Sequence, residues 1–225
     1  MNINHNKNTP MLPQETKNVL LIALIAMLRM FGLFALLPVM SIFASKLENS
    51  TPMLIGISVG AYGLTQAVLQ IPFGYLSDKI GRKPVIIFGL LIFISGCAIA
   101  AYSNSIYGLI AGRLLQGAGA ISATLSALLS DVTRDEVRTK SMAIFGIGIG
   151  ASFLLSLILG PVISSYYGAR SIFIISIFMS LMSIVVLMNI PSKKIINHHE
   201  PIKIMNLLKK NLILHDLNIF FLHQV

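Results

Sequence analysis

The chain has 225 residues, of which 55% are hydrophobic and 11% are charged, whereas an average soluble domain has about 25% charged residues. This composition excludes an ordinary soluble globule. The 17 Lys and Arg residues outnumber the 8 Asp and Glu residues and give a net charge of +9, but they punctuate long apolar runs and form no basic stripe between aromatic residues, so we expect no nucleic-acid partner. Cys97 is the single cysteine, so we predict no intramolecular disulfide and no metal-thiolate site. We also expect no other metal site and no cofactor.

Six apolar runs are each long enough to cross the hydrocarbon core of a bilayer, which takes about 20 helical residues. Backbone groups in lipid must be hydrogen-bonded within the protein, and the alternation typical of a membrane β-barrel is not visible. The sequence therefore predicts an all-α membrane protein with a six-helix bundle over residues 18–190. The polar N-terminal segment 1–17 before it lacks the features of a removable signal peptide. In chain order the predicted spans are 19–43, 53–77, 84–102, 106–130, 141–167 and 171–190.

Basic residues in the connections predict the orientation of the bundle, because Lys and Arg concentrate on the cytoplasmic side of a membrane. Thirteen of them lie before the first span, in the second and fourth connections and after the sixth span, whereas the opposite side has two. We therefore expect a multi-pass protein of a bacterial-type inner membrane, with a cytoplasmic N-terminus and membrane lipid as a partner. The thirteen are Lys7, Lys17, Lys79, Arg82, Lys83, Arg134, Arg138, Lys140, Lys193, Lys194, Lys203, Lys209 and Lys210, and the two are Lys46 and Arg170.

The composition changes after the sixth predicted span. Residues 191–211 are polar and typical of a cytoplasmic linker, and apolar residues return over 212–225. This last stretch is too short to cross a bilayer, so it is either a helix that lies at the membrane interface or the start of a seventh crossing. We favour a truncated seventh span, because the stretch lacks the basic polar face of an interfacial helix.

The connection between the second and third spans reads GYLSDKIGRKP, beginning at Gly74. That glycine allows another helix to approach closely, Asp78 places a carboxylate at a helix end, and Gly81 permits a tight turn. Arg82 and Lys83 keep the connection in the cytoplasm. The alternative is a plain basic turn between two helices, but such a turn requires neither the acid nor a glycine four residues before it.

This run resembles the loop signature of the major facilitator superfamily, G-x-x-x-[DE]-[RK]-x-G-[RK]-[RK], at each specified position. The chain is similar to inner-membrane transport proteins and to drug and proton antiporters of that superfamily. The resemblance implies two six-helix halves around a central cavity, with this chain as the N-terminal half and a complementary C-terminal half as a partner. It also implies that Asp78 acts in a conformational latch, with Arg82 paired to Asp131 at the end of the fourth span. From the sequence alone, Asp131 is equally a helix-end residue at the water interface.

Two arginines interrupt apolar spans, where ionisable residues point to function by default. Arg29 lies near the middle of the first span. Since the interior of the six spans holds no Asp or Glu, its charge must meet Gln66, Gln70, backbone carbonyls, water or an anionic ligand group. Arg113 begins a run that resembles the fourth-helix pattern of the superfamily, R-x-x-Q-G-x-G-A, which implies a role in proton coupling. The alternative is an arginine that extends to water at a helix end. The other residues of that pattern are Gln116, Gly117, Gly119 and Ala120.

Glycines and a proline mark the fifth predicted span. Gly146, Gly150 and Gly160 permit close helix packing, and Pro161 removes a backbone donor, which favours a kink. The run resembles the antiporter motif of the superfamily, although two serines stand where that motif has a Gly-Gly pair. Plain helix packing therefore explains these residues as well as antiport does.

The sequence predicts a secondary transporter that moves a small amphipathic solute by alternating access, and the resemblance implies proton-coupled efflux. The sequence has no phosphate-binding loop that would support ATP-driven transport. We expect no enzymatic activity: an intramembrane serine protease would need a general base, and all five histidines lie outside the six predicted spans. The alternative is a membrane-embedded remnant that does not transport, or a half that needs a partner chain.

Overall fold

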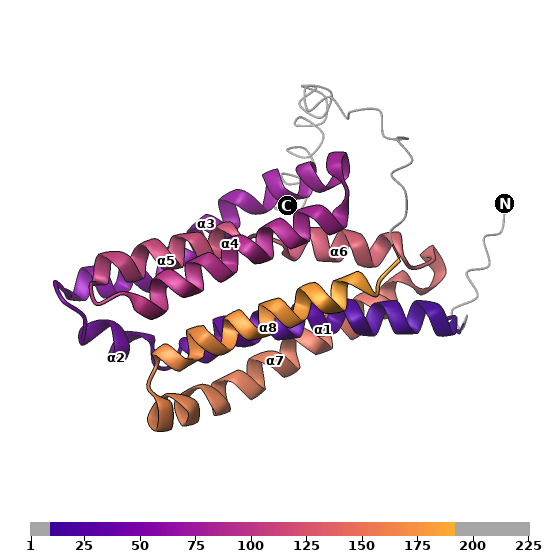
Figure 1. Cartoon of the computed structure of the whole chain (residues 1–225). Coiled ribbons are helices and arrows are strands. Elements are labelled where there is room, and N and C mark those ends of the chain that lie inside the picture. Colours follow the sequence, from indigo (N-terminus) through magenta and orange to yellow (C-terminus); the bar gives the residue numbers. More distant parts are fainter. Residues whose placement is uncertain (1–9, 192–225) are drawn as a thin grey trace, which may run out of the picture. The chain divides into compact units, whose positions relative to one another are not determined.

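The computed structural model describes residues 10–191, so the predicted linker beyond Pro191 and the apolar stretch 212–225 lie outside the described residues. Within that range the regular structure is α-helical, except for one 3₁₀ turn (η1) and one isolated bridge between Glu48 and Ser105. The long helices run side by side along one direction (Figure 1). In chain order the elements are α1 (Pro13–Leu36), α2 (Met40–Ser45), α3 (Pro52–Ile80), α4 (Arg82–Tyr102), α5 (Ile106–Ala118), α6 (Ser122–Asp131), η1 (Asp135–Val137), α7 (Arg138–Tyr167) and α8 (Arg170–Met188).

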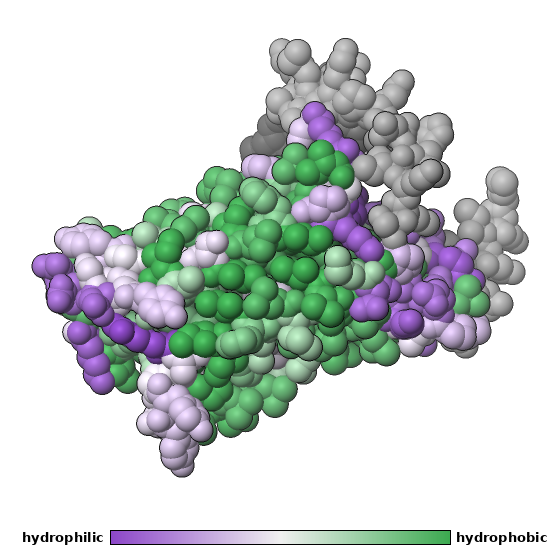
Figure 2. All heavy atoms as spheres, viewed as in Figure 1, coloured by the Kyte–Doolittle hydropathy of each residue, from purple (hydrophilic) through white to green (hydrophobic). Residues whose placement is uncertain are grey.

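Five helical segments in the described range are long and apolar enough to cross a membrane: α1, α3, α4, α7 together with η1, and α8. The face of the bundle in Figure 2 has an apolar band across its middle and polar residues at both ends. Such a band is unfavourable in water over a large area but fits the hydrocarbon layer between two polar interfaces. The structure therefore confirms the predicted all-α membrane protein.

Two predicted spans are each divided into two helices, which corrects the expectation of continuous helices there. The first span breaks after Leu36, because Pro38 has no backbone N–H to continue the hydrogen-bond ladder; α2 follows the break. The fourth span breaks at Gly119, whose ψ of 48° is outside the helical range. Figure 1 shows α5 and α6 following one another along the length of the bundle. α5 has 13 residues and α6 has 10, so neither is long enough to cross a bilayer alone, and together they make up the fourth predicted span.

Helix packing relies on small residues that let backbones approach closely. α1 packs mainly on α7 and α8, α5 packs on α3 and α4, and the contact of α8 with α4 joins the two groups. A Cβ added at Gly160 would meet the backbone of Ala35, and one added at Gly117 would meet the carbonyl oxygen of Tyr62. The hydroxyl of Ser152 also donates a 2.8 Å hydrogen bond from α7 to the Met27 carbonyl of α1. These contacts leave no room for larger side chains.

The glycines predicted to pack on α7 fall into two groups. Gly160 packs as expected, but a Cβ added at Gly146 or Gly150 would meet nothing within 4 Å in the described structure. Within residues 10–191 these two glycines therefore have no packing role, because they lie on the exposed side of α7, whereas Gly148 faces Ala23 on α1. The helix stays continuous through Pro161, from Arg138 to Tyr167.

Candidate functional site

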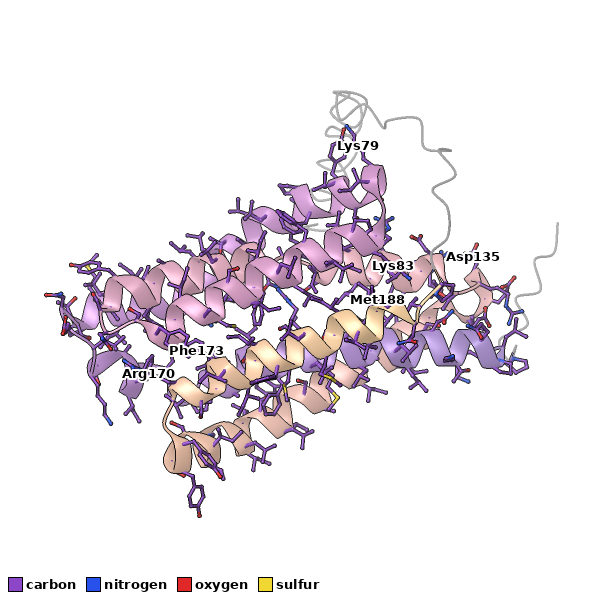
Figure 3. The ribbon with its side chains drawn as sticks, viewed as in Figure 1. Lys79, Lys83, Asp135, Arg170, Phe173 and Met188 are labelled. Carbon is purple, nitrogen blue, oxygen red and sulfur yellow. The ribbon has the colours of Figure 1, made fainter. Side chains whose placement is uncertain are left out.

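The turn between α3 and α4 lies at the end of the bundle that we call the basic end, which carries Lys79, Arg82, Lys83, Arg134 and Arg138. Figure 3 shows Lys79 and Lys83 towards this end and Arg170 at the opposite end. Gly81 closes α3 and opens α4 with φ of 104°, a backbone conformation that favours glycine. Gly74, about two helical turns before it, faces the Cβ of Ala123 on α6 at the edge of van der Waals contact.

Arg82 connects three helix ends at the basic end. Its guanidinium lies 2.6 Å from the carboxylate of Asp78 at the end of α3 and 3.0 Å from that of Asp131 at the end of α6. It also donates a 2.6 Å hydrogen bond to the hydroxyl of Ser77. The side chain of Arg82 is 21% exposed, so both ion pairs are partly screened by water. The geometry brings together Asp78, Arg82 and Asp131, the residues for which the resemblance implied a conformational latch, whereas Lys83 forms no ion pair within residues 10–191.

A second ion pair at the basic end joins Glu15 near the start of α1 to Arg134, which follows α6. The carboxylate of Glu15 accepts hydrogen bonds from Nε, Nη2 and the backbone N–H of Arg134, at 2.9, 3.1 and 3.1 Å. It also accepts a 2.9 Å bond from the backbone N–H of Leu12. Hydrogen bonding to this carboxylate raises the pKa of Arg134. Glu15 is only 6% exposed, so the pair anchors the start of α1 to the α6–η1 connection.

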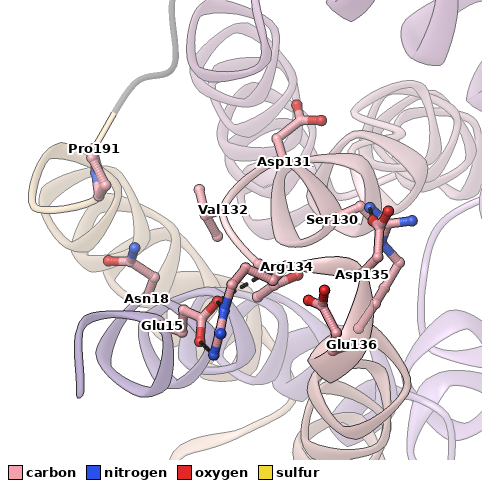
Figure 4. A pocket seen from close by; sticks show the side chains of 11 residues that line it. Glu15, Asn18, Ser130, Asp131, Val132, Arg134, Asp135, Glu136 and Pro191 are labelled. Atoms are coloured by element: carbon pink, nitrogen blue, oxygen red, sulfur yellow. Dashed lines mark hydrogen bonds and ion pairs between the residues drawn. The ribbon is translucent and has the colours of Figure 1, made fainter. Parts of the chain in front are cut away.

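The Glu15–Arg134 pair lines a pocket of about 710 Å³ (Figure 4). Asn18, Asp131 and Glu136 also line this pocket, which therefore has mixed charge. Sequence reasoning missed the pair, because its members lie 119 residues apart. A local signal was present in Pro13 and Glu15, since proline at the first position and glutamate at the third are typical of a helix start.

Arg29 lies within the bundle and is 1% exposed. Its Nη2 donates a 2.7 Å hydrogen bond to the carbonyl of Gly119, and its Nη1 donates a 3.3 Å bond to the hydroxyl of Ser122. The guanidinium also lies 5.5 Å from the ring centroid of Phe93, a cation–π geometry. Arg29 therefore contacts both sides of the break between α5 and α6.

Arg113 lies in a second buried polar cluster, between α3, α4 and α5, and is also 1% exposed. Its Nη1 donates a 2.8 Å hydrogen bond to Gln116, whose amide nitrogen lies 3.1 Å from the sulfur of Cys97. Its Nε donates to the carbonyl of Ser58 at 3.4 Å, and its guanidinium lies 4.9 Å from the ring centroid of Tyr62. Full burial argues against the alternative of an arginine extended to water.

The two buried arginines share one feature, which is that their acceptors are neutral. Among the described residues, neither arginine forms an ion pair, and neither makes a hydrogen bond to Gln66 or Gln70 of α3. Several buried polar atoms nearby lack a hydrogen-bond partner in the same range, including Arg29 Nε, the Tyr62 hydroxyl, Gln66 Oε1 and Thr124 Oγ1. The described residues also contain no cluster of His, Cys, Asp and Glu suited to a metal ion.

Sequence comparison shows which known proteins this chain resembles. The chain is 53% identical over 137 residues to the Inner membrane transport protein YajR of Escherichia coli, a match that covers 61% of this chain and 30% of that protein. It is 31% identical over 155 residues to a class H tetracycline resistance protein of Pasteurella multocida, which covers 68% of this chain and 38% of that protein. The chain thus spans well under half the length of these relatives.

Solved structures and a family profile agree with these matches. The POT family transporter PepTSo superposes with a TM-score of 0.70 and 17% identity, over 82% of this chain and 39% of that one; at that identity the likeness concerns the fold. The sequence profile of the Major Facilitator Superfamily matches residues 22–222. Because this match covers most of the sequence, the chain belongs to the Major Facilitator Superfamily.

Proposed function

We propose that the chain is the N-terminal lobe of a secondary transporter that exports small amphipathic solutes in exchange for protons by alternating access. Relatives named as tetracycline and methylenomycin resistance proteins support an efflux function. The observation that carries the proposal is the pair of buried arginines, because an uncompensated guanidinium inside an apolar bundle is costly and points to a functional site. The superfamily consists of transporters, which agrees with the expected absence of enzymatic activity.

The basic end faces the cytoplasm in this proposal, which places the N-terminus there as well. Lys79, Lys83 and Arg138 support this orientation, since basic residues in short connections stay on the cytoplasmic side. The Arg82 ion pairs then act at the cytoplasmic ends of α3, α4 and α6. There they would hold these ends together in one state of the transport cycle and release them in another.

A complementary C-terminal lobe is the partner that fits this chain. In each of the candidate spans α3 and α7, only 17% of the most apolar 18-residue stretch is buried within the described bundle, whereas 56% of the corresponding stretch of α1 is buried. The open surface at Gly146 and Gly150 lies on α7, where small residues would let a facing helix approach closely. We therefore assign the exposed sides of α3 and α7 to contact with a second lobe.

Transport in proteoliposomes tests the proposal. The chain would be reconstituted alone and together with the C-terminal half of the Escherichia coli relative, and efflux of a fluorescent dye would be followed with and without an imposed proton gradient. We expect gradient-dependent efflux only with both halves present, and we expect Arg113→Ala to abolish it. Arg170→Ala, at the opposite end from the latch, is the matched control and should retain efflux.

Two outcomes would contradict the proposal. Gradient-dependent efflux that survives Arg113→Ala would remove the buried arginine from the coupling mechanism. Absence of flux from the assembled halves, in a preparation whose circular dichroism shows folded helices, would favour the membrane-embedded remnant that does not transport.

A further inference from the structure

The break in the fourth predicted span, between α5 and α6, creates a helix N-terminus inside the bundle. α6 begins at Ser122, and its N-cap residue Ile121 provides no side-chain hydrogen bond to the first turn. The first backbone N–H groups of a helix have no partner within the helix and carry the positive end of its dipole. Ten residues of regular α-helix follow this start. An uncapped helix N-terminus attracts anionic groups.

Arg29 adds a full positive charge at the same place. Its two terminal nitrogens are bonded to Gly119 and Ser122, on either side of the break. Its Nε is buried without a hydrogen-bond partner among the described residues. A guanidinium whose hydrogen-bond acceptors are all neutral carries an uncompensated charge in an apolar bundle, so a bound anionic group would stabilise it.

Thr124 supplies a second unpartnered donor in the first turn of α6. This residue is 0% exposed, and its hydroxyl has no hydrogen-bond partner in the described structure. Buried hydroxyls are normally hydrogen-bonded, so an orphan is a candidate ligand contact. Ser122, two residues earlier at the start of α6, is partly exposed, which leaves an approach to the terminus from the bundle surface.

We propose that the N-terminus of α6, together with Arg29, Ser122 and Thr124, binds the carboxylate of an amphipathic solute. The guanidinium and the hydroxyls donate hydrogen bonds to the carboxylate, and its charge meets the positive end of the helix dipole. This inference rests on the proposed function and names its substrate class.

Binding of a matched set of aromatic probes to the full chain in lipid nanodiscs tests the proposal. Benzoate, benzyl alcohol and benzylammonium share a ring and differ in charge, and saturation-transfer NMR reports the binding of each. We expect benzoate to bind more tightly than the other two. We expect Arg29→Gln to weaken benzoate binding about tenfold or more, the loss of one charge-assisted hydrogen bond. Arg170→Gln, which removes an exposed guanidinium bonded to Ser103 and Asn104 at the opposite end of the bundle, is the matched control and should bind benzoate unchanged.

Thr124→Val keeps the test informative even if Arg29→Gln fails to fold. Valine has nearly the same shape as threonine, and the hydroxyl it removes has no partner in the described structure. The variant should therefore unfold no more easily than the parent without ligand, yet bind benzoate about threefold to tenfold more weakly.

Three results would overturn the proposal. The first is that benzylammonium binds as tightly as benzoate, and the second is that benzoate binding is unchanged in both Arg29→Gln and Thr124→Val. The third is that chloride displaces benzoate at equal concentration, which would make the site one for inorganic anions. The assay is independent of transport. Dye efflux without benzoate binding would refute this inference and leave the proposed function standing, whereas benzoate binding without gradient-driven flux would refute only the proposed function.

Discussion

Arginine side chains have opposite surroundings at the basic end and in the interior of the bundle. At the basic end Arg82 and Arg134 each meet a carboxylate, and both side chains remain partly exposed. In the interior Arg29 and Arg113 are buried, face aromatic rings and bond to neutral acceptors. Ion pairs at the water interface hold helix ends together at little cost. Interior guanidiniums without a carboxylate are a burden on stability, so their presence points to ligand binding or coupling.

Packing shows the same contrast between interior and surface, and it gives the largest expected effect on stability. Gly117→Val would push a side chain against the Tyr62 carbonyl and the Thr65 hydroxyl. Because a backbone atom cannot move aside easily, we expect a loss near the upper end of the overpacking range of about 1–3 kcal/mol. Unfolding in mixed micelles with rising SDS, followed by circular dichroism, measures it.

Gly146→Val is the matched control for that experiment, since an added Cβ there meets nothing within 4 Å in the described bundle. It should leave the stability of the isolated chain nearly unchanged. In a reconstituted pair of lobes it should instead impair transport if this surface faces the second lobe. Equal destabilisation by both valines would show that the interior is no more tightly packed than the exposed side of α7.

The next effect concerns the buried member of the Glu15–Arg134 pair. Glu15→Gln removes a carboxylate that accepts four hydrogen bonds, three of them from Arg134, and we expect a loss of about 1–2 kcal/mol. A double-mutant cycle with Arg134→Gln isolates the contribution of the pair. Additive losses in that cycle would mean that the two residues stabilise the basic end independently.

Much of the fold could be predicted from the sequence, because span length and charge placement are local properties. The apolar runs predicted the crossings, and the glycine in the α3–α4 turn predicted its sharpness, which the φ of Gly81 shows. The resemblance implied the pairing of Arg82 with Asp131, which lie 3.0 Å apart. The latch role of this pair remains a prediction.

The break between α5 and α6 could not be predicted, because its cause is not local. No proline lies between residues 106 and 131, and the carbonyl at the break is bonded to Arg29, 90 residues earlier in the chain. Likewise the sequence does not show that Gly160 meets α1 while Gly146 meets nothing, since both have apolar neighbours in the chain. Which side of a helix is covered depends on the tertiary arrangement.

A smaller effect is expected for Arg82, which is partly exposed. Arg82→Gln removes ion pairs to Asp78 and Asp131 that water partly screens, so we expect a loss of about 0.5–1 kcal/mol. The loss should shrink as salt is raised. A larger loss that salt does not change would indicate that the pairs are desolvated in the membrane. The same SDS titration at low and high ionic strength distinguishes the two.

The smallest effect is expected at the opposite end, where Arg170 forms no ion pair with any residue of the described range. Arg170 donates hydrogen bonds to the Ser103 carbonyl at 3.0 Å and to the Asn104 side chain at 2.7 Å, all in an exposed setting. Water can replace both bonds, so Arg170→Gln should change stability by less than about 0.5 kcal/mol. Micelle unfolding of this variant beside Arg82→Gln compares the two ends directly. If Arg170→Gln costs as much as Arg82→Gln, the carboxylates at the basic end add nothing to stability, and their value must lie in the conformational cycle.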